Sequence, residues 1–151
     1  MATAAVLAAV VVPSGCSSSG SGCRSTSVRV APPQVADVQA AFDVSATVTA
    51  SGHPVAGVPV AVWGWGRPPG QTSELGGQLG SAVTGADGTA TVHIPATVPG
   101  GALNSLNRLN GTEFVRVSAE AAAATVGGQA YCASKGEAPV ACGSGRCMVG
   151  R

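Results

Sequence analysis

A strict alternation of apolar and polar residues between positions 42 and 49 constrains this chain more than any other feature. The segment reads FDVSATVT, with an apolar side chain at every second position and Asp, Ser or Thr between them. Successive side chains of a β-strand point to opposite faces, so this pattern predicts a strand with one face buried and the other in water. The chain is therefore expected to contain a half-buried β-sheet.

Further short segments of the same kind follow, separated by turn residues. VPVAVW at 58–63 follows the turn SGHPVAG, and we expect it to form a hairpin with the first strand. SAVTGADGTATVHIP at 81–95 predicts a second hairpin, with Asp87 and Gly88 in its turn. TEFVRVSAEA at 112–121 resumes the alternation and predicts a strand whose valines and Ala119 point inward.

The two ends of the β region are less regular. A short strand beginning at Val28 is expected to end at Pro32 and Pro33, because proline donates no hydrogen bond to a sheet. A last strand is expected near 125–132. With 22 Gly and 10 Pro in the chain, about seven short strands between turns are the pattern of an all-β sandwich.

Two segments interrupt the strand pattern. The stretch 64–80 is rich in glycine and is expected to form a long loop. Leu103, Leu106 and Leu109 recur every three residues, which predicts one or two helical turns laid over an end of the sandwich.

The N-terminus carries an export pattern. The segment MATAAVLAAVVV is shorter than the roughly 20 residues that span a bilayer and matches the apolar region of a signal peptide. PSGC then places Cys16 before a Ser/Gly stretch, which resembles the lipobox of bacterial lipoproteins, although Pro13 stands where that family usually has Leu. The resemblance implies a signal peptide at 1–16 ending in a lipidated Cys, and an extracytoplasmic protein, membrane-anchored or secreted. An ordinary apolar segment of a non-exported protein is the alternative.

The remaining chain then divides into a Ser/Gly tether at 17–27 and a sandwich at 28–151 with a cysteine-rich tail. The five cysteines fit this division, because lipidation of Cys16 leaves an even number for disulfides in an oxidising compartment. Spacing does not choose among the three possible pairings, and we favour Cys132 with Cys142 across a local hairpin and Cys23 with Cys147 joining the two ends. Intervals of nine and four residues in the tail do not suit a zinc site.

The order of these segments resembles the bacterial immunoglobulin-like domains of invasin- and intimin-type surface proteins. VSATVTASGHPVAGVPVAVW, TGADGTATVHIP and VRVSAEA carry the resemblance, which covers about half of the chain. It implies an immunoglobulin-like sandwich that serves as an extracellular structural or adhesive module without a cofactor. Transthyretin-like and carboxypeptidase-regulatory modules share these turns, and the tail loosely resembles the cysteine loops of neocarzinostatin-like chromophore carriers.

Neither catalysis nor nucleic-acid binding is expected. His53 and His93 are the only histidines, and their placement in a turn and on an outward strand position predicts solvated side chains. The carboxylates are scattered, and no Gly-x-Ser-x-Gly motif occurs. A net charge of +1 without a basic run gives no electrostatic footprint for nucleic acid.

Trp63 and Trp65 are the candidate ligand-binding residues. Counting by twos from the valines before them places both on the outward face of their strand, where with the following loop they could frame an aromatic platform for sugar rings or a partner protein. Arg67 is expected to stack on either ring. The alternative is that a bulge at Gly64 turns one Trp inward, or that the following loop folds back over both.

We therefore expect a non-catalytic cell-surface lipoprotein that carries an immunoglobulin-like structural or adhesive module, with the membrane as partner through its lipid. Two alternatives remain open. One is a small carbohydrate- or peptide-binding domain that uses the tryptophan pair. The other is an immunoglobulin-like subunit of a filament or virion surface.

Overall fold

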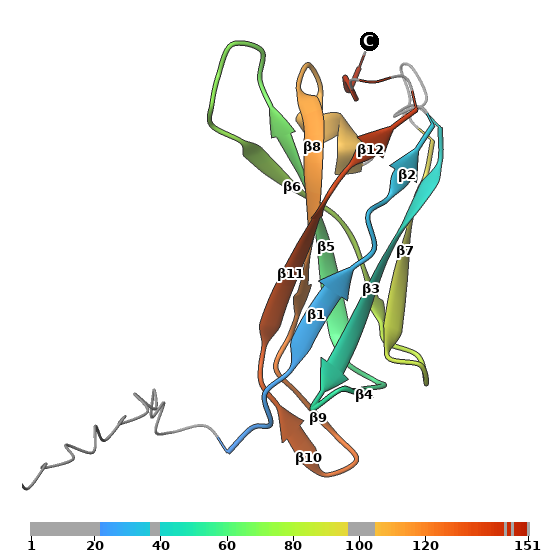
Figure 1. Cartoon of the computed structure of the whole chain (residues 1–151), viewed down its shortest axis with the longest axis vertical. Coiled ribbons are helices and arrows are strands. Elements are labelled where there is room, and N and C mark those ends of the chain that lie inside the picture. The colour runs from blue at the N-terminus through green and yellow to red at the C-terminus, as the bar shows by residue number, and fades with distance from the viewer. Residues whose placement is uncertain (1–21, 37–39, 97–104, 144, 146, 151) are drawn as a thin grey trace, which may run out of the picture.

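The computed structural model describes residues 22–36, 40–96, 105–143, 145 and 147–150. In this part of the chain almost every element is a β-strand, and most of the strands form two facing sheets (Figure 1). Within each of these two sheets every neighbouring pair of strands is antiparallel. The first sheet contains β1 (Ser27–Val30), β3 (Phe42–Ala50), β7 (Thr89–Ile94) and the short β4 (His53–Pro54). The second contains β11 (Ser134–Pro139), β8 (Glu113–Ala121), β5 (Pro59–Arg67) and β6 (Leu75–Val83), in that order.

The strand order confirms the predicted sandwich. Each sheet has four strands, and without the two-residue β4 the two sheets together hold seven. In the first sheet β3 lies between β1 and β7, and in the second β8 lies between β11 and β5. This is the arrangement of an immunoglobulin-like sandwich.

Pro32 and Pro33 end the first strand as expected, and the chain then changes sheets. The next strand, β2 (Gln34–Val35), pairs in parallel with β12 (Ala141–Cys142), which follows β11 of the second sheet. The two prolines therefore mark the crossing of the N-terminal strand from one side of the sandwich to the other.

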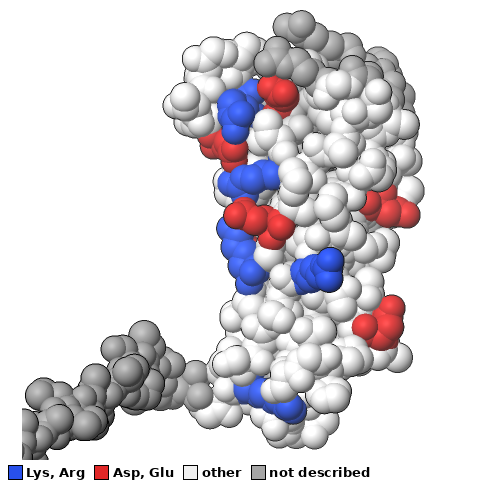
Figure 2. Space-filling model, viewed as in Figure 1, with Lys and Arg blue, Asp and Glu red and all other residues white. Residues whose placement is uncertain are grey.

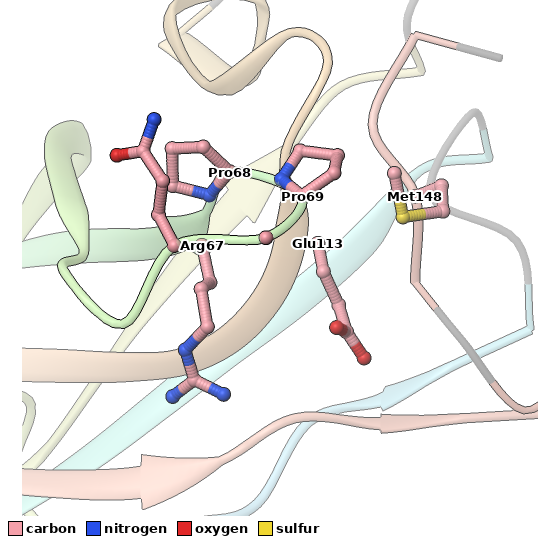
Figure 3. Close-up of a pocket in the computed structure, with 7 residues that line it drawn as sticks. Arg67, Pro68, Pro69, Glu113 and Met148 are labelled. Carbon is pink, nitrogen blue, oxygen red and sulfur yellow. The ribbon is translucent and has the colours of Figure 1, made fainter.

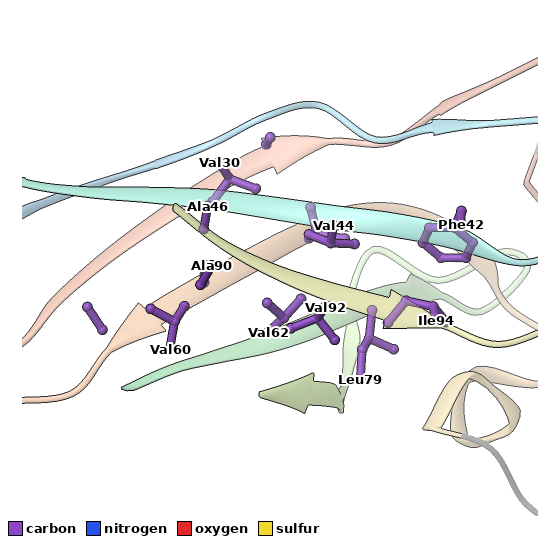
Figure 4. Packing of buried hydrophobic residues seen from close by; sticks show 14 of the residues in the cluster. Val30, Phe42, Val44, Ala46, Val60, Val62, Leu79, Ala90, Val92 and Ile94 are labelled. Atoms are coloured by element: carbon purple, nitrogen blue, oxygen red, sulfur yellow. The ribbon is translucent and has the colours of Figure 1, made fainter. Parts of the chain in front are cut away.

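The core lies between the two sheets and is built mainly from valine and alanine (Figure 4). Strand β3 turns Val44 and Val48 inward, and both are fully buried. From the other sheet, β5 buries Val60 and Val62. The core holds few aromatic side chains, and the rings of Phe42 and Phe114 lie 6.0 Å apart at one end.

Both predicted hairpins are wrong, because the chain crosses between sheets at these points. Strand β3 turns back only into β4, through Ser51 and Gly52, both with positive φ; β5 then joins the other sheet. Likewise β6 pairs with β5, whereas β7 pairs with β3. An alternating pattern predicts which side chains of a strand face the core. It does not predict whether the next strand pairs with that strand in the same sheet or lies opposite it in the other sheet.

The expected long loop at 64–80 is also wrong, since most of it continues β5 and forms β6. Glycine is depleted in strands because it adds no side-chain packing. Here glycine provides room: a Cβ on Gly76 would lie 2.8 Å from the Trp65 ring, and one on Gly80 would lie 2.6 Å from Val92. The glycines in β6 therefore allow neighbouring side chains to pack over the backbone.

Two details of the last strands differ from the expectation. The register of β5 on β8 shifts between Trp65 and Gly66, so that Phe114 and Val117 are buried while Val115 is half-exposed. This bulge makes the inward placement of Val115 wrong. The predicted strand at 125–132 is a small hairpin, β9 (Ala124–Val126) and β10 (Gln129–Tyr131), whereas the edge strand of the sandwich is β11, within the predicted tail.

The predicted helical turn is confirmed as the 3₁₀ helix η1 (Ser105–Leu109). It fully buries Leu106 and Leu109 at the end of the sandwich, against β6 and β5. A 3₁₀ helix has three residues per turn, which matches the spacing of these leucines. Leu103 lies outside the described residues.

The structure contains two disulfides, Cys23–Cys132 and Cys142–Cys147, and our favoured pairing is therefore wrong. Strand β11 lies between Cys132 and Cys142 and carries them to opposite ends of the sandwich. Beside Cys132, the backbone of Arg24 bonds to that of Ala130 and Cys132 itself, which brings the Cα atoms of Cys23 and Cys132 within 5.1 Å.

The N-terminal predictions fall partly outside the described residues. The signal segment 1–16 with Cys16, and the tether up to residue 21, are not among them. Residues 22–26 lie alongside β10, and β1 begins at Ser27 within the range expected for the tether. Over the described ranges, no helix is long and apolar enough to cross a membrane.

Candidate functional site: the tryptophan face

The outer face of the sheet β11, β8, β5 and β6, here termed the tryptophan face, carries both candidate tryptophans. Trp63 and Trp65 alternate along β5 with the buried Val62, Gly64 and Gly66. The register of β5 on β6 shifts between Val62 and Trp63, but neither tryptophan turns inward. Their outward placement is therefore confirmed, and the alternative of a ring rotated into the core is excluded.

Trp65 is enclosed by its neighbours on this face. Its indole Nε1 donates a hydrogen bond to Ser118 Oγ at 2.9 Å, and its ring extends over Gly76 of β6. The guanidinium carbon of Arg116 lies 4.3 Å from the ring centroid, and Lys135 Nζ lies 5.5 Å from it. Arg116 from β8 thus makes the cation–π contact that we expected of Arg67.

Arg67 instead belongs to a chain of ion pairs beside Trp65. Its Nη2 lies 2.9 Å from Glu74 Oε1, and Arg116 Nε lies 2.7 Å from Glu74 Oε2. Arg116 Nη1 also lies 2.7 Å from Glu137 Oε2. Figure 2 shows charged groups of both signs gathered along the β8 and β11 side of the sandwich. The network fixes Arg116 over the indole ring, because its guanidinium is held on two sides.

Glu74 is the central anion of this network, and its side chain is 19% exposed. Partial burial acts to raise its pKa, but hydrogen bonds and positive charge from Arg116 and Arg67 outweigh that effect, so the pKa lies below its ordinary value. Glu74 therefore remains ionised at neutral pH and joins the β5–β6 loop to β8.

Trp63 is half-buried and differs from Trp65 in its hydrogen bonding. It lies between Gln78 of β6 and Ser118 of β8 in the register of the sheet. Its Nε1 is buried and has no hydrogen-bond partner among the described residues. Buried indole N–H groups usually have a partner, so this donor is an unusual feature of the face.

A cavity of about 390 Å³ lies at the end of this face, beside the β5–β6 loop (Figure 3). Gln71 N donates to Pro68 O, and Gly70 has a φ of 74°, which together give a type II turn with Pro69 and Gly70 at its centre. Met148 forms the opposite wall. The lining residues are Arg67, Pro68, Pro69, Gly70, Gln71, Glu113 and Met148.

Four residues of this region were not predicted as site residues: Glu74, Arg116, Glu137 and Met148. Alternation along β8 could have placed Arg116 on the outward face with the tryptophans, since it lies next to the inward Val117. The pairing of β8 with β11, which brings Glu137 beside Arg116, has no local sequence signal, and the bridge between Met148 and Glu113 has none either.

The two histidines lie elsewhere and are solvent-exposed, as predicted. His53 is in β4, and His93 is on the outer face of β7. His93 Nδ1 lies 2.7 Å from Asp43 Oδ1, with both side chains more than half exposed. Among the described residues, no three His, Cys, Asp or Glu side chains come together to hold a metal ion.

Comparison with known proteins adds no relative to these observations. No protein-family model matches the chain, and a search of curated proteins finds no match.

Proposed function

We propose that this protein is an exported, non-catalytic immunoglobulin-like module that serves as a structural or adhesive unit at the cell surface. The observation that carries the proposal is the Cys23–Cys132 disulfide, which joins the segment after the expected tether to the last third of the chain. Disulfides persist in oxidising compartments and are rare in the cytosol, so the two disulfides fit an extracytoplasmic location.

The cysteine count supports a lipid anchor. The two disulfides use four of the five cysteines and leave Cys16, the residue in the lipobox-like segment. A leftover cysteine in an exported protein calls for another role, and diacylation is the role that this segment suggests.

The positions of the chain ends suit a module held away from a membrane. Residues 22–26 enter beside β10 at one end of the sandwich, and the segment after β12 lies at the other end (Figure 1). The Cys23–Cys132 bond fixes the entry point, so a pull on the tether acts on a covalent link rather than on β1 alone. The cavity beside the β5–β6 loop then lies at the end remote from the membrane.

Fractionation of cells that express the full chain tests the anchor. We expect Cys16→Ala to move the protein out of the membrane fraction, whereas the matched change Ser17→Ala leaves it there. The intact mass should correspond to a diacylated chain that begins at Cys16 and has no free thiols. Membrane association that survives Cys16→Ala, or a mass that begins at Met1 with free thiols, contradicts the proposal.

A second candidate is recognition of a sugar or peptide by the tryptophan face. Trp63 favours it, because this ring is half-exposed and its buried N–H has no partner among the described residues. Trp65 is already covered by Arg116, so the ligand contact falls on Trp63. Glycan-array binding that is lost in Trp63→Ala and kept in the control Gln129→Ala supports this candidate, and binding unchanged in both rejects it.

A further inference from the structure

Strand β6 is an edge strand that lacks protective charged and proline residues, although β7 and η1 lie close to it. It pairs with β5 on one side and with no other strand among the described residues on its other side. Its sequence, LGGQLGSAV, contains neither a charged residue nor a proline. Edge strands expose backbone N–H and C=O groups, and natural proteins usually shield them with charges, prolines or a covering segment.

The opposite edge of the same sheet has all three of these protections. Strand β11 carries Lys135, Glu137 and Pro139, each exposed. Strand β1 also lies against it, because a Cβ on Gly136 would meet the backbone oxygen of Val28. A strand of the first sheet lies near each edge, β1 near β11 and β7 near β6. The two edges therefore differ in their charged and proline residues, and this difference needs an explanation specific to β6.

The side chains of β6 are complementary to those of a second β6. Leu75 and Val83 are the exposed large apolar residues of the described chain, at 51% and 60% exposure, and both lie on this strand. Gly76 and Gln78 face outward with the tryptophans, and after the irregularity at Leu79 the outward positions are Ser81 and Val83. These outward positions are symmetric about the middle of the strand.

We infer that β6 is a self-association site, at which the β6 strands of two copies pair antiparallel about a two-fold axis between Leu79 and Gly80. In an antiparallel pair, a residue whose side chain points outward lies opposite a residue of the other strand whose side chain also points outward. This places Gln78 opposite Ser81 and Gly76 opposite Val83 of the second copy. Val83 of one copy then meets Gly76 of the other, where the glycine leaves the space that the Trp65 ring occupies.

The pairing is isologous, so each contact occurs twice, and the uncharged strand brings no like charges together. It joins two four-stranded sheets into one continuous sheet without disturbing either core. The inference concerns the β6 edge alone and does not rest on export or on the lipid anchor.

Sedimentation velocity over a range of concentrations tests the site, on full chains that carry Cys16→Ser so that lipid makes no contribution. For the parent we expect the weight-average sedimentation coefficient to rise with concentration toward that of a dimer. Gln78→Lys with Ser81→Lys places like charges directly opposite each other twice, and we expect this variant to stay monomeric. The control Gln129→Lys adds charge on an exposed position of β10 and should behave as the parent.

A charge swap tests the register. A second variant, Gln78→Glu with Ser81→Glu, should also stay monomeric alone, whereas an equimolar mixture of the two variants should recover the association. Circular dichroism that matches the parent shows that each variant is folded. A parent that remains monomeric at every concentration overturns the inference, as does a lysine variant that still associates or a mixture that does not.

Discussion

The two outer faces of the sandwich are built from the same kind of strand, yet they differ in how their side chains interact. On the outer face of β1, β3 and β7, here termed the hydroxyl face, the exposed Asp43 and His93 form one pair. Elsewhere on this face short neutral side chains pair across neighbouring strands. Their oxygens lie 2.8 Å apart for Ser27 and Thr49, 2.9 Å for Ser45 and Thr91, and 3.2 Å for Thr47 and Thr89.

The tryptophan face uses long side chains from four strands and a loop. Trp65 from β5 rests on β6, bonds to β8 and lies under cations from β8 and β11. Glu74 adds the β5–β6 loop to the same cluster. Loss of one side chain from such a cluster removes several interactions at once. Loss of one hydroxyl removes a single interaction between two strands. The tryptophan face should therefore contribute more to stability, and the hydroxyl face should tolerate change.

Trp65→Ala should produce the largest effect. The change removes the ring that packs on Gly76, the hydrogen bond to Ser118 and the cation–π contact of Arg116. Truncation of a fully buried Trp costs about 3–5 kcal/mol, and because this ring is half-buried we expect about 2–4 kcal/mol. Urea unfolding with the disulfides intact measures the loss. Trp65→Phe, which keeps a ring, should lose clearly less, and a loss below about 1 kcal/mol for Trp65→Ala would mean that the ring does not organise this face.

Gly76→Ala tests the same packing from the other strand. The added Cβ would lie 2.8 Å from Cζ3 of Trp65, so the ring must move, and overpacking of this kind costs about 1–3 kcal/mol. Gly143→Ala is the matched control, because the nearest atom to its added Cβ is 3.7 Å away. The control should be neutral or slightly stabilising, since alanine restricts the unfolded chain. Equal effects at both positions would contradict the close packing of Trp65 on β6.

Only some parts of this packing could be predicted from the sequence. Alternation was sufficient for β3, for β5 as far as Val62, and for the outward placement of both tryptophans, because each follows from neighbouring residues. Alternation did not predict β6, because the glycines that make room for the Trp65 ring are typical of a loop sequence. It also failed for the hairpins, since the choice between pairing and crossing depends on contacts between distant strands.

The partners in the disulfides and ion pairs could not be predicted for the same reason. The partner of Cys23 depends on where the β9–β10 hairpin lies, and the partner of Arg116 depends on a loop that begins after β5. The use of Cys23, Cys132, Cys142 and Cys147 in two disulfides could be predicted, because it follows from the even number of cysteines that remain beside Cys16. Which cysteine meets which is a property of the folded chain.

Glu74→Gln should have an intermediate effect of about 1 kcal/mol, because it removes the charge that links Arg67 and Arg116 but keeps the side-chain shape. The pKa of Glu74 in the folded chain lies below its ordinary value of 4.5. The ionised carboxylate therefore stabilises the fold above pH 4.5, and this contribution is lost as the pH falls from 4.5 through the folded pKa. Urea unfolding at several pH values should show this loss in the parent and a smaller one in Glu74→Gln. Parallel pH profiles for the two proteins would contradict a role for the Glu74 charge.

The smallest effect should come from Ser45→Val combined with Thr91→Val on the hydroxyl face. The double change removes both hydroxyls of one pair, so no donor or acceptor is left without a partner, and a net loss of about 1 kcal/mol for the hydrogen bond is an upper limit. Valine has a high β-propensity and packs well across strands, which offsets that loss. The free energy of unfolding should therefore change by less than about 0.5 kcal/mol, against the several-fold larger change for Trp65→Ala. A loss comparable to that of Trp65→Ala would mean that the hydroxyl pairs also act as a connected network, and that the contrast between the two faces does not hold.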